Sequence, residues 1–185
     1  MPRPQFELTL PQWVDGFLKE HGRNFPTELS GMQLAVNLAQ QNIQEQTGGP
    51  FGAIVLDADG SLVSVGINLV LSTRISLWHA EMVALALAQK SLGTQDLSQK
   101  GDLTLISSCE PCAMCLGAIP WSGIRRLICG ASDADARAVG FDEGAKPENW
   151  RRELEHRGIE VLTGVLAKEA RQVLEDYARC DGKIY

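Results

Sequence analysis

The sequence of 185 residues contains no apolar run long enough to cross a bilayer and no N-terminal pattern of a secretory signal. Such a signal would combine a basic start, an apolar run and a small-residue cleavage site. We therefore expect a soluble cytoplasmic protein without a membrane partner. The chain also has no internal repeat, low-complexity tract or linker. With 44% hydrophobic and 22% charged residues, it predicts a core that needs no disulfide support.

Basic charge is scarce as well. The sequence has 17 Lys and Arg against 23 Asp and Glu, which gives a formal net charge of -6. Nucleic-acid binding usually shows as a basic face or tail that replaces counterions on phosphates. No such tail is present, and residues 133–185 carry charges of both signs. We therefore expect a small-molecule substrate and no nucleic-acid partner.

Cysteines are few, odd in number and unevenly spaced. Three of the five, Cys109, Cys112 and Cys115, crowd into one short stretch. This spacing is typical of metal binding rather than of a disulfide framework, and it fits a reducing compartment. Cys129 and Cys180 are expected to be ordinary buried or free thiols.

Two short stretches carry the candidate chemistry, HAE at residues 79–81 and PCAMC at residues 111–115. Zinc prefers four tetrahedral ligands, so His79, Cys112 and Cys115 would leave one position open for water, as in catalytic sites. Glu81 is then free to carry protons. A zinc-activated water beside a carboxylate suits attack on an electron-poor carbon that bears an amino group, with release of ammonia.

The alternative is a closed structural site in which Cys109 supplies a fourth zinc ligand. Such a site would leave Glu81 without a role, so we favour the open site. Without its neighbours, Glu81 could also be one of the acids that commonly stabilise a helix N-terminus. Replacement of Cys109 by Ser separates the two kinds of site, because unchanged zinc content and activity would exclude the closed one.

Apolar periodicity predicts the elements that precede these stretches. Residues 10–18 have the spacing of a short amphipathic helix, and Thr27 can cap a longer helix that stops at the Gly-Gly-Pro of residues 48–50. Two apolar runs, residues 53–56 and 62–67, are joined by a turn with the sequence Asp-Ala-Asp-Gly. The turn predicts a hairpin of two strands.

Helices and strands alternate in the rest of the chain. The predicted order is a helix over residues 79–91, a strand over 103–107, a helix from 112, a strand over 124–129, a helix over 147–156, a strand over 159–162 and a helix around 170–177. This alternation indicates parallel crossovers. We predict an α/β fold, a three-layer α/β/α sandwich with a central mixed five-stranded sheet. Both stretches should meet at the carboxyl ends of adjacent strands.

HxE followed by PCxxC is the signature of zinc nucleobase deaminases. The sequence accordingly resembles the cytidine deaminase superfamily and is similar to a cytidine deaminase-like catalytic domain. Within it, GGPFGA at residues 48–53, HAE, and SCEPCAMCLGA at residues 108–118 look most like bacterial guanine deaminases. The GFDE of residues 140–143 and the C-terminal KIY also resemble that family. The shared core motifs leave tRNA adenosine deaminases as the nearest alternative, and a zinc-stabilised binding protein without turnover as a third.

The resemblance implies conversion of guanine and water to xanthine and ammonia, with triazines as further substrates. Glu81 would be the catalytic proton shuttle, and Glu143 a second catalytic carboxylate that binds the amine and relays protons. His79 would stack near the purine base as well as bind zinc. The other residues implied to contact the base are Asn68, Phe51, Ala80, Trp121 and Tyr185.

The resemblance also implies a homodimer in which the C-terminal segment crosses to the partner subunit, so that Tyr185 closes the neighbour's pocket. Residues 1–26 are expected to be an extension with a short helix, and residues 27–185 the catalytic domain. Trp78 stands before His79 where a small residue was expected, which can alter the pocket or the dimer.

Each of these residues also has a plainer interpretation. Glu143 can be a solvated loop acid, and Asn68 can simply make a turn. Phe51 and Trp121 can belong to the core, and Tyr185 can be a frayed chain end. The residues by themselves leave these alternatives open.

Overall fold

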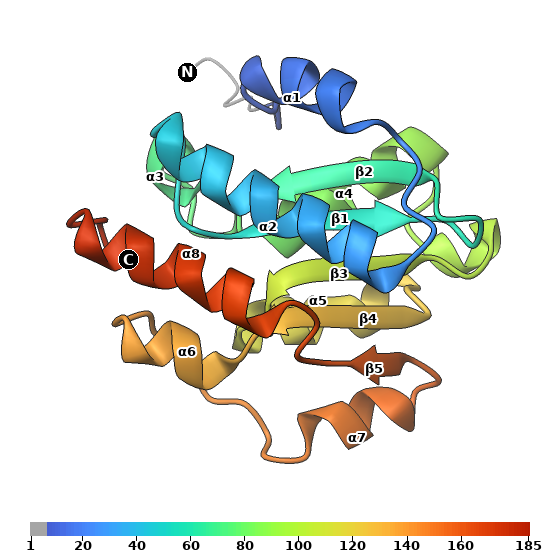
Figure 1. The fold of residues 1–185 in the computed structure, drawn as a ribbon. Coiled ribbons are helices and arrows are strands. Elements are labelled where there is room, and N and C mark those ends of the chain that lie inside the picture. Colours follow the sequence, from blue (N-terminus) through green and yellow to red (C-terminus); the bar gives the residue numbers. More distant parts are fainter. Residues whose placement is uncertain (1–6) are drawn as a thin grey trace, which may run out of the picture.

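A mixed sheet of five strands forms the centre of the molecule (Figure 1). In the computed structural model, which describes residues 7–185, the strands are β1 (Gly52–Leu56), β2 (Leu62–Ile67), β3 (Thr104–Cys109), β4 (Arg126–Ala131) and β5 (Glu160–Leu162). Their order is β2-β1-β3-β4-β5. β1 is antiparallel to β2 and β3, whereas β3, β4 and β5 are parallel. The first six residues of the expected N-terminal extension lie outside the described residues.

Helices cover both faces of this sheet (Figure 1). One face carries α2 (Glu28–Gln44) and α8 (Ala167–Arg179), and the other carries α4 (Ala80–Leu92) and α5 (Ala113–Ser122). The remaining helical elements are α1 (Trp13–His21), α3 (Val70–Thr73), the 3-10 helix η1 (Leu97–Lys100), α6 (Asp133–Ala138) and α7 (Trp150–Glu155). The predicted three-layer α/β/α sandwich with a mixed five-stranded sheet is confirmed.

Over residues 7–185, no helix combines the length and the apolar character that a membrane span requires.

The start of α2 shows how local sequence produces an element. The Thr27 hydroxyl accepts a hydrogen bond from the Ser30 amide at 3.1 Å, and the Thr27 amide donates to the Ser30 hydroxyl at 3.2 Å. This reciprocal capping box satisfies amides that have no partner inside the helix. Gly31 then brings α2 against the sheet, because a side chain there would collide with Ile106.

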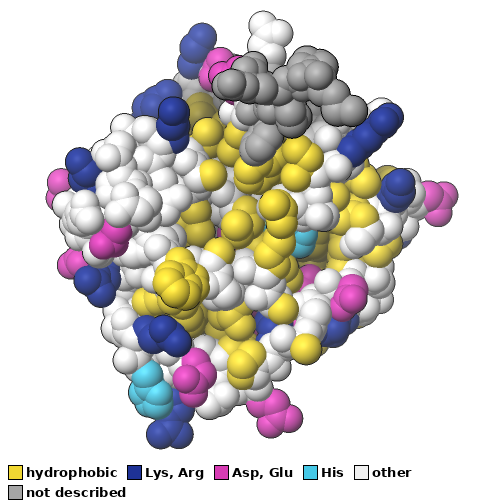
Figure 2. All heavy atoms as spheres, turned by 180° about the vertical axis from the view of Figure 1, so that it is seen from behind, with side chains coloured by type: hydrophobic (Ala, Val, Ile, Leu, Met, Phe, Trp, Pro, Cys, Tyr) yellow, Lys and Arg dark blue, Asp and Glu magenta, His cyan; other side chains and the backbone are white. Residues whose placement is uncertain are grey.

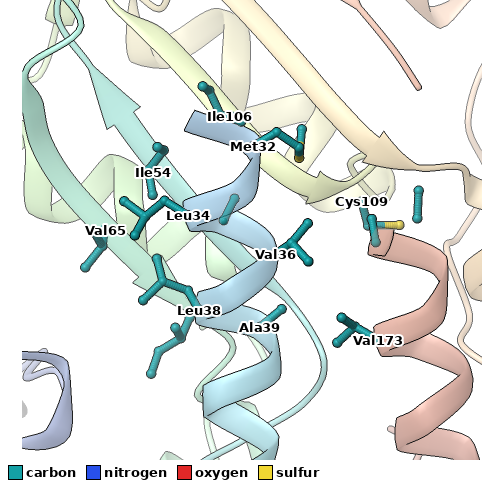
Figure 3. Close-up of a cluster of buried hydrophobic side chains, with 14 of the residues drawn as sticks. Met32, Leu34, Val36, Leu38, Ala39, Ile54, Val65, Ile106, Cys109 and Val173 are labelled. Carbon is teal, nitrogen blue, oxygen red and sulfur yellow. The ribbon is translucent and has the colours of Figure 1, made fainter. Parts of the chain in front are cut away.

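The core between α2, the sheet and α8 is built from aliphatic side chains (Figure 3). Met32 and Val36 of α2 pack with Ile54 and Ile106 of the sheet and with Val173 of α8, and all five are buried. Burial of one such side chain stabilises the fold by about 1.5–3 kcal/mol. This packing holds the strand ends, where the site forms, in fixed positions.

Most predicted elements are present with shifted ends. The helix expected over residues 10–18 is α1, which begins and ends later, and the hairpin of β1 and β2 is confirmed. The sequence prediction missed α3, η1 and α6. These elements are too short to show an apolar period, so nothing in the pattern separates them from loops.

The predicted arrangement of strands next to the two motifs is wrong in one respect. β2 and β3, which precede the HAE and PCAMC stretches, are not neighbours, because β1 lies between them. Since β1 is antiparallel to both, β2 and β3 point in the same direction. The helices that follow them, α4 and α5, therefore begin at the same end of the sheet, and the motifs meet across β1.

Candidate active site

Three side chains with metal-binding atoms converge where α4 and α5 begin. His79 is the N-cap of α4, Cys112 is the N-cap of α5, and Cys115 lies in the first turn of α5. Their ligand atoms all lie within 4.8 Å of one another, and Cys112 Sγ is 3.4 Å from His79 Nδ1. One imidazole nitrogen and two cysteine sulfurs are donors that zinc prefers. The cluster therefore fits a zinc ion held by three protein ligands.

Cys109 does not take part in this cluster. Its thiol donates to the backbone carbonyl of Ser132 at 3.7 Å. Among residues 7–185 the cluster consists of His79, Cys112 and Cys115. Burial raises the pKa of Cys109 well above its usual value, so this thiol stays protonated at neutral pH. A site with three protein ligands leaves one coordination position for water, which is typical of catalytic rather than structural zinc.

Cys112 is predisposed to be a thiolate. A hydrogen bond from the Cys115 thiol, with a second from His79, outweighs burial and lowers the pKa of Cys112 to about 4. The N-terminus of α5 also favours negative charge at this position. Since the thiolate is the form that binds metal, these contacts prepare Cys112 for coordination.

Glu81 lies beside the cluster in the first turn of α4 and is only 6% exposed. Burial, together with the negative charge of Cys112, raises the pKa of Glu81 to about 6. A carboxyl group whose pKa is close to neutral can both accept and return a proton. Glu81 therefore has the position and the acidity of a proton carrier.

Glu143 supplies a second buried carboxyl group. It lies in the loop between α6 and α7 and is 5% exposed, so it is not a solvated loop acid. Its backbone carbonyl accepts a hydrogen bond from the Ala113 amide at 2.9 Å, which ties the loop to α5. Burial and the charges of Cys112 and Glu81 raise the pKa of Glu143 to about 8.

These groups line one pocket together with aromatic side chains. The predicted residues on its wall are His79, Glu81, Cys112, Glu143, Phe51 and Tyr185. Three residues that sequence reasoning did not assign to the site, Glu110, Phe141 and Asp142, also line it. All three belong to the SCEPC and GFDE stretches, which also contain Cys112 and Glu143. Their position beside these candidate residues is the signal that could have assigned them to the site.

Phe141 is the centre of the aromatic wall. Its ring lies edge-to-face with Phe51 at 4.9 Å between centroids and with Tyr185 at 5.6 Å. The Tyr185 hydroxyl rests against Gly49, where a side chain would collide with it. With Tyr185 in place the free space is about 30 Å³, which is enough for water but not for a purine ring. Tyr185 thus lies over the pocket of its own chain.

Three predicted contact residues are placed differently. Trp121 is 86% exposed near the end of α5 and does not line this pocket, so its predicted contact with the ring stays a prediction. Ala80 is fully buried, and its methyl group packs in the core beneath α4. Asn68 is buried, its side chain accepts a hydrogen bond from the Val70 amide at 3.2 Å, and it also lies outside the wall of the pocket. This contact is the turn interaction that the plainer interpretation predicts.

Asn42 supports the pocket from behind. Its side-chain amide donates to the carbonyls of Gly49 at 2.8 Å and Asn68 at 2.9 Å. Its oxygen accepts from the Thr47 hydroxyl at 2.6 Å, and that hydroxyl accepts from the Trp13 indole at 3.1 Å. A continuous hydrogen-bonded chain thus connects α1 with the segments that carry Gly49 and Asn68.

The model of the cytidine and deoxycytidylate deaminase zinc-binding region matches residues 27–131 of this chain, which is more than half of its length. The chain belongs to this deaminase family. The matched range includes the three residues of the His-Cys-Cys cluster and Glu81.

Relatives within the deaminase family are known in sequence and structure. Guanine deaminase of Bacillus subtilis is 39% identical over 112 residues, which cover 60% of this chain and 69% of that protein. The tRNA-specific adenosine deaminase of Haemophilus influenzae is 35% identical, covering 69% of this chain and 70% of that protein. The solved guanine deaminase of Nitrosomonas europaea is 41% identical with a TM-score of 0.88, covering 95% of this chain and 97% of that one. A solved structure that contains 8-azaguanine is also 41% identical, with a TM-score of 0.88 and coverage of 95% and 98%.

Proposed function

We propose that this deaminase converts guanine and water to xanthine and ammonia. The observation that carries the proposal is a pocket in which two buried carboxyl groups, Glu81 and Glu143, flank an open His-Cys-Cys cluster. The guanine deaminase of Nitrosomonas europaea supports it, because the likeness extends over nearly the whole of both chains. The tRNA-specific adenosine deaminase matches a smaller part of this chain at lower identity.

We propose zinc as the cofactor, held by His79, Cys112 and Cys115. When bound, zinc supplies an activated water at neutral pH. Glu81 accepts a proton from the attacking water and returns it to the amine that leaves. Its pKa near 6 allows transfer in both directions. The nitrogen then departs as ammonia, and the oxygen of water remains on the ring.

Glu143 gives the pocket its preference for guanine in this proposal. The edge of guanine that carries the amino group is rich in N–H donors, and a carboxylate accepts such donors well. Because the pKa of Glu143 is about 8, its carboxyl group is mostly protonated at neutral pH and can pass this proton to the departing amine, which leaves the carboxylate that accepts the N–H donors. Phe51 and Phe141 offer apolar faces to the flat ring. Other amino-substituted rings of this shape, including triazines, are further candidate substrates.

Tyr185 has to move before a purine can enter. The space beneath it suffices only for water, so the C-terminal segment must withdraw and then close again over the substrate. In a homodimer this closing side chain can come from the partner subunit, and we retain that exchange as part of the proposal. Asn68, next to Phe51 through a backbone hydrogen bond of 3.1 Å, becomes available to the base in the open pocket.

A second copy of the chain is the partner that we propose. Figure 2 shows hydrophobic side chains gathered over the face that lies behind the sheet in Figure 1, the face of α4 and α5. Trp121 of α5 is 86% exposed, and a groove of about 350 Å³ lies beside it. Exposed apolar patches of this kind commonly mark protein interfaces.

We further propose that the enzyme works in the cytoplasm, because all five cysteines are free thiols. We retain residues 27–185 as the catalytic unit and residues 1–26 as an extension, whose described part includes α1.

Release of ammonia from free guanine by the zinc-loaded protein tests the proposed function. We expect turnover by the wild type, and loss of nearly all turnover in Glu81→Gln with zinc content and circular dichroism spectrum unchanged. A general acid-base group commonly contributes about 10²–10⁴-fold to the rate. If the protein formed inosine in a tRNA anticodon loop and no xanthine from guanine, the substrate would be adenosine in tRNA rather than free guanine. Full activity in Glu81→Gln would remove Glu81 from the mechanism.

A further inference from the structure

Lys146 is a buried lysine that no step of the proposed reaction uses. It follows Glu143 by three residues in the loop between α6 and α7, and its side chain is only 7% exposed. Lysine is almost never buried without partners, since its ammonium group loses hydration. The partners of Lys146 therefore indicate what its burial achieves.

The ammonium group of Lys146 contacts three different segments. It donates to the backbone carbonyl of Pro111 at 2.8 Å, and it lies 2.5 Å from Oδ1 of Asp133. It is also 4.0 Å from Oε2 of Glu143. Lys146 is not part of the pocket wall, so it does not reach the substrate itself.

Each of these contacts leads back to the active site. Pro111 immediately precedes the proposed ligand Cys112, so the lysine joins its own loop to the segment that holds zinc. Asp133, the first residue of α6, is fixed in turn by Arg137, whose Nε lies 2.6 Å from Oδ2. The same arginine donates to the carbonyl of Gly144 at 2.7 Å.

Glu143 is thus restrained from both sides within its loop. Arg137 holds the residue that follows it, and Lys146 anchors the loop to Asp133 and Pro111. The contact between the Glu143 carbonyl and α5 alone would leave the carboxyl group free to turn outward, where loop acids are normally solvated. A displacement of about 1 Å in a reacting group can lower the rate on the order of 100-fold.

We propose that Lys146 is a positioning residue for the deamination, joining Asp133 to the carbonyl of Pro111 and thereby holding the carboxyl group of Glu143 in the pocket. The inference rests on the proposed function, because Glu143 needs this support only if it handles the substrate. Lys146 acts through Glu143 and is not itself a catalytic residue.

Replacement of Lys146 by Met removes the ammonium group and keeps most of the apolar stem. We expect kcat with guanine to fall on the order of 100-fold in Lys146→Met, with zinc content unchanged. Lys146→Arg keeps a cation with several donors and should recover part of the loss. Lys168→Met, at an exposed position in the first turn of α8, is the matched control and should behave as the wild type.

A double-mutant cycle identifies the route of the effect. In the Glu143→Gln background, we expect the addition of Lys146→Met to change kcat by no more than about twofold, because the residue through which Lys146 acts is already altered. If Lys146→Met lowers kcat as strongly in that background as in the wild type, or leaves the wild-type kcat unchanged, the inference is overturned. If Lys146→Met does not fold, Lys146→Gln takes its place.

Hydrogen exchange gives a readout that needs no substrate. In the zinc-loaded protein we expect faster amide exchange over residues 140–146 in Lys146→Met than in Lys168→Met. Equal exchange in the two variants would overturn the inference even if the wild type proved inactive on guanine. Inactivity of the wild type with guanine, together with faster exchange in Lys146→Met, would count against the proposed function and leave the loop anchor standing.

Discussion

The pKa values of three acidic residues in and near the pocket shift in different directions, upward for Glu81 and Glu143 and downward for Asp133. Burial raises the pKa of Glu81 to about 6 and that of Glu143 to about 8. Burial also disfavours ionisation of Asp133, but hydrogen bonds from Arg137 and Lys146 outweigh it and lower the pKa of Asp133. Carboxyl groups with pKa values near neutral can exchange protons, whereas one with a lowered pKa remains an anion. Their environments thus suit Glu81 and Glu143 for proton transfer and keep Asp133 an anion that anchors its partners.

The anchoring role of Asp133 predicts how stability depends on pH. Because the folded-state pKa of Asp133 lies below its unfolded value of about 4, its stabilisation is present above that value and is lost as pH falls through the folded pKa. We expect Asp133→Asn to lower the free energy of unfolding at neutral pH. The difference from the wild type should shrink as pH falls below about 4. Urea unfolding followed by circular dichroism measures both, and a difference independent of pH would contradict the assignment.

At the scale of elements, α1 does more than cover the core. Val14 is buried, and the Trp13 indole begins the hydrogen-bonded chain through Thr47 and Asn42 to the segments of Gly49 and Asn68. Gly49 in turn rests against Tyr185, the side chain that closes the pocket. A helix outside the range of the matched family model therefore supports the wall of the site.

Two substitutions test this support. Trp13→Phe removes one hydrogen bond and should lower the free energy of unfolding by about 1 kcal/mol. Thr47→Val removes the bonds to both Trp13 and Asn42, so we expect a larger loss of stability and a higher KM for guanine. Urea unfolding and steady-state kinetics measure these changes. A Thr47→Val variant with the stability and KM of the wild type would show that the chain does not support the pocket.

The elements that carry the motifs were predictable from sequence, whereas the pocket wall was predictable only in part. The alternation of apolar strand runs with Ala- and Leu-rich helical runs placed His79 and Cys112 at helix starts. The loop that brings Glu143 inward has no period, and its burial depends on the long-range contacts of Lys146 with Pro111 and Asp133. Local spacing cannot reveal such contacts.

Trp121 follows the SCEPCAMCLGA stretch and lies near the exposed end of α5. Because no recognised motif includes this residue, the motifs carried no information on where its side chain points. Likewise, the motifs did not reveal that β1 separates β2 from β3. Strand order depends on pairings between distant segments, and the hairpin alone left it undetermined.

For the whole molecule, the exposed face of α4 and α5 predicts the state of assembly. We expect the wild type to be a dimer by light scattering coupled to gel filtration, and Trp121→Glu to be a folded monomer, because a charge at this position opposes burial in an interface. Leu29→Glu, at a residue that is 60% exposed on α2 of the opposite face, is the control and should remain dimeric. If Trp121→Glu remained dimeric, or if the wild type were a monomer, the predicted dimer interface at this face would be wrong.

The two outer strands of the sheet restrict how copies of the chain can join. β5 has only three residues, and Glu160 within it pairs with Arg126. Next to the start of β2, the Leu62 amide donates to the carbonyl of Arg23 at 2.9 Å, and Asn24 forms a bridge with Ser61. Short or covered edges resist the strand addition that leads to fibrils. Variants that lose contact through α5 should therefore remain dispersed single chains, even at high concentration, rather than assemble edge to edge.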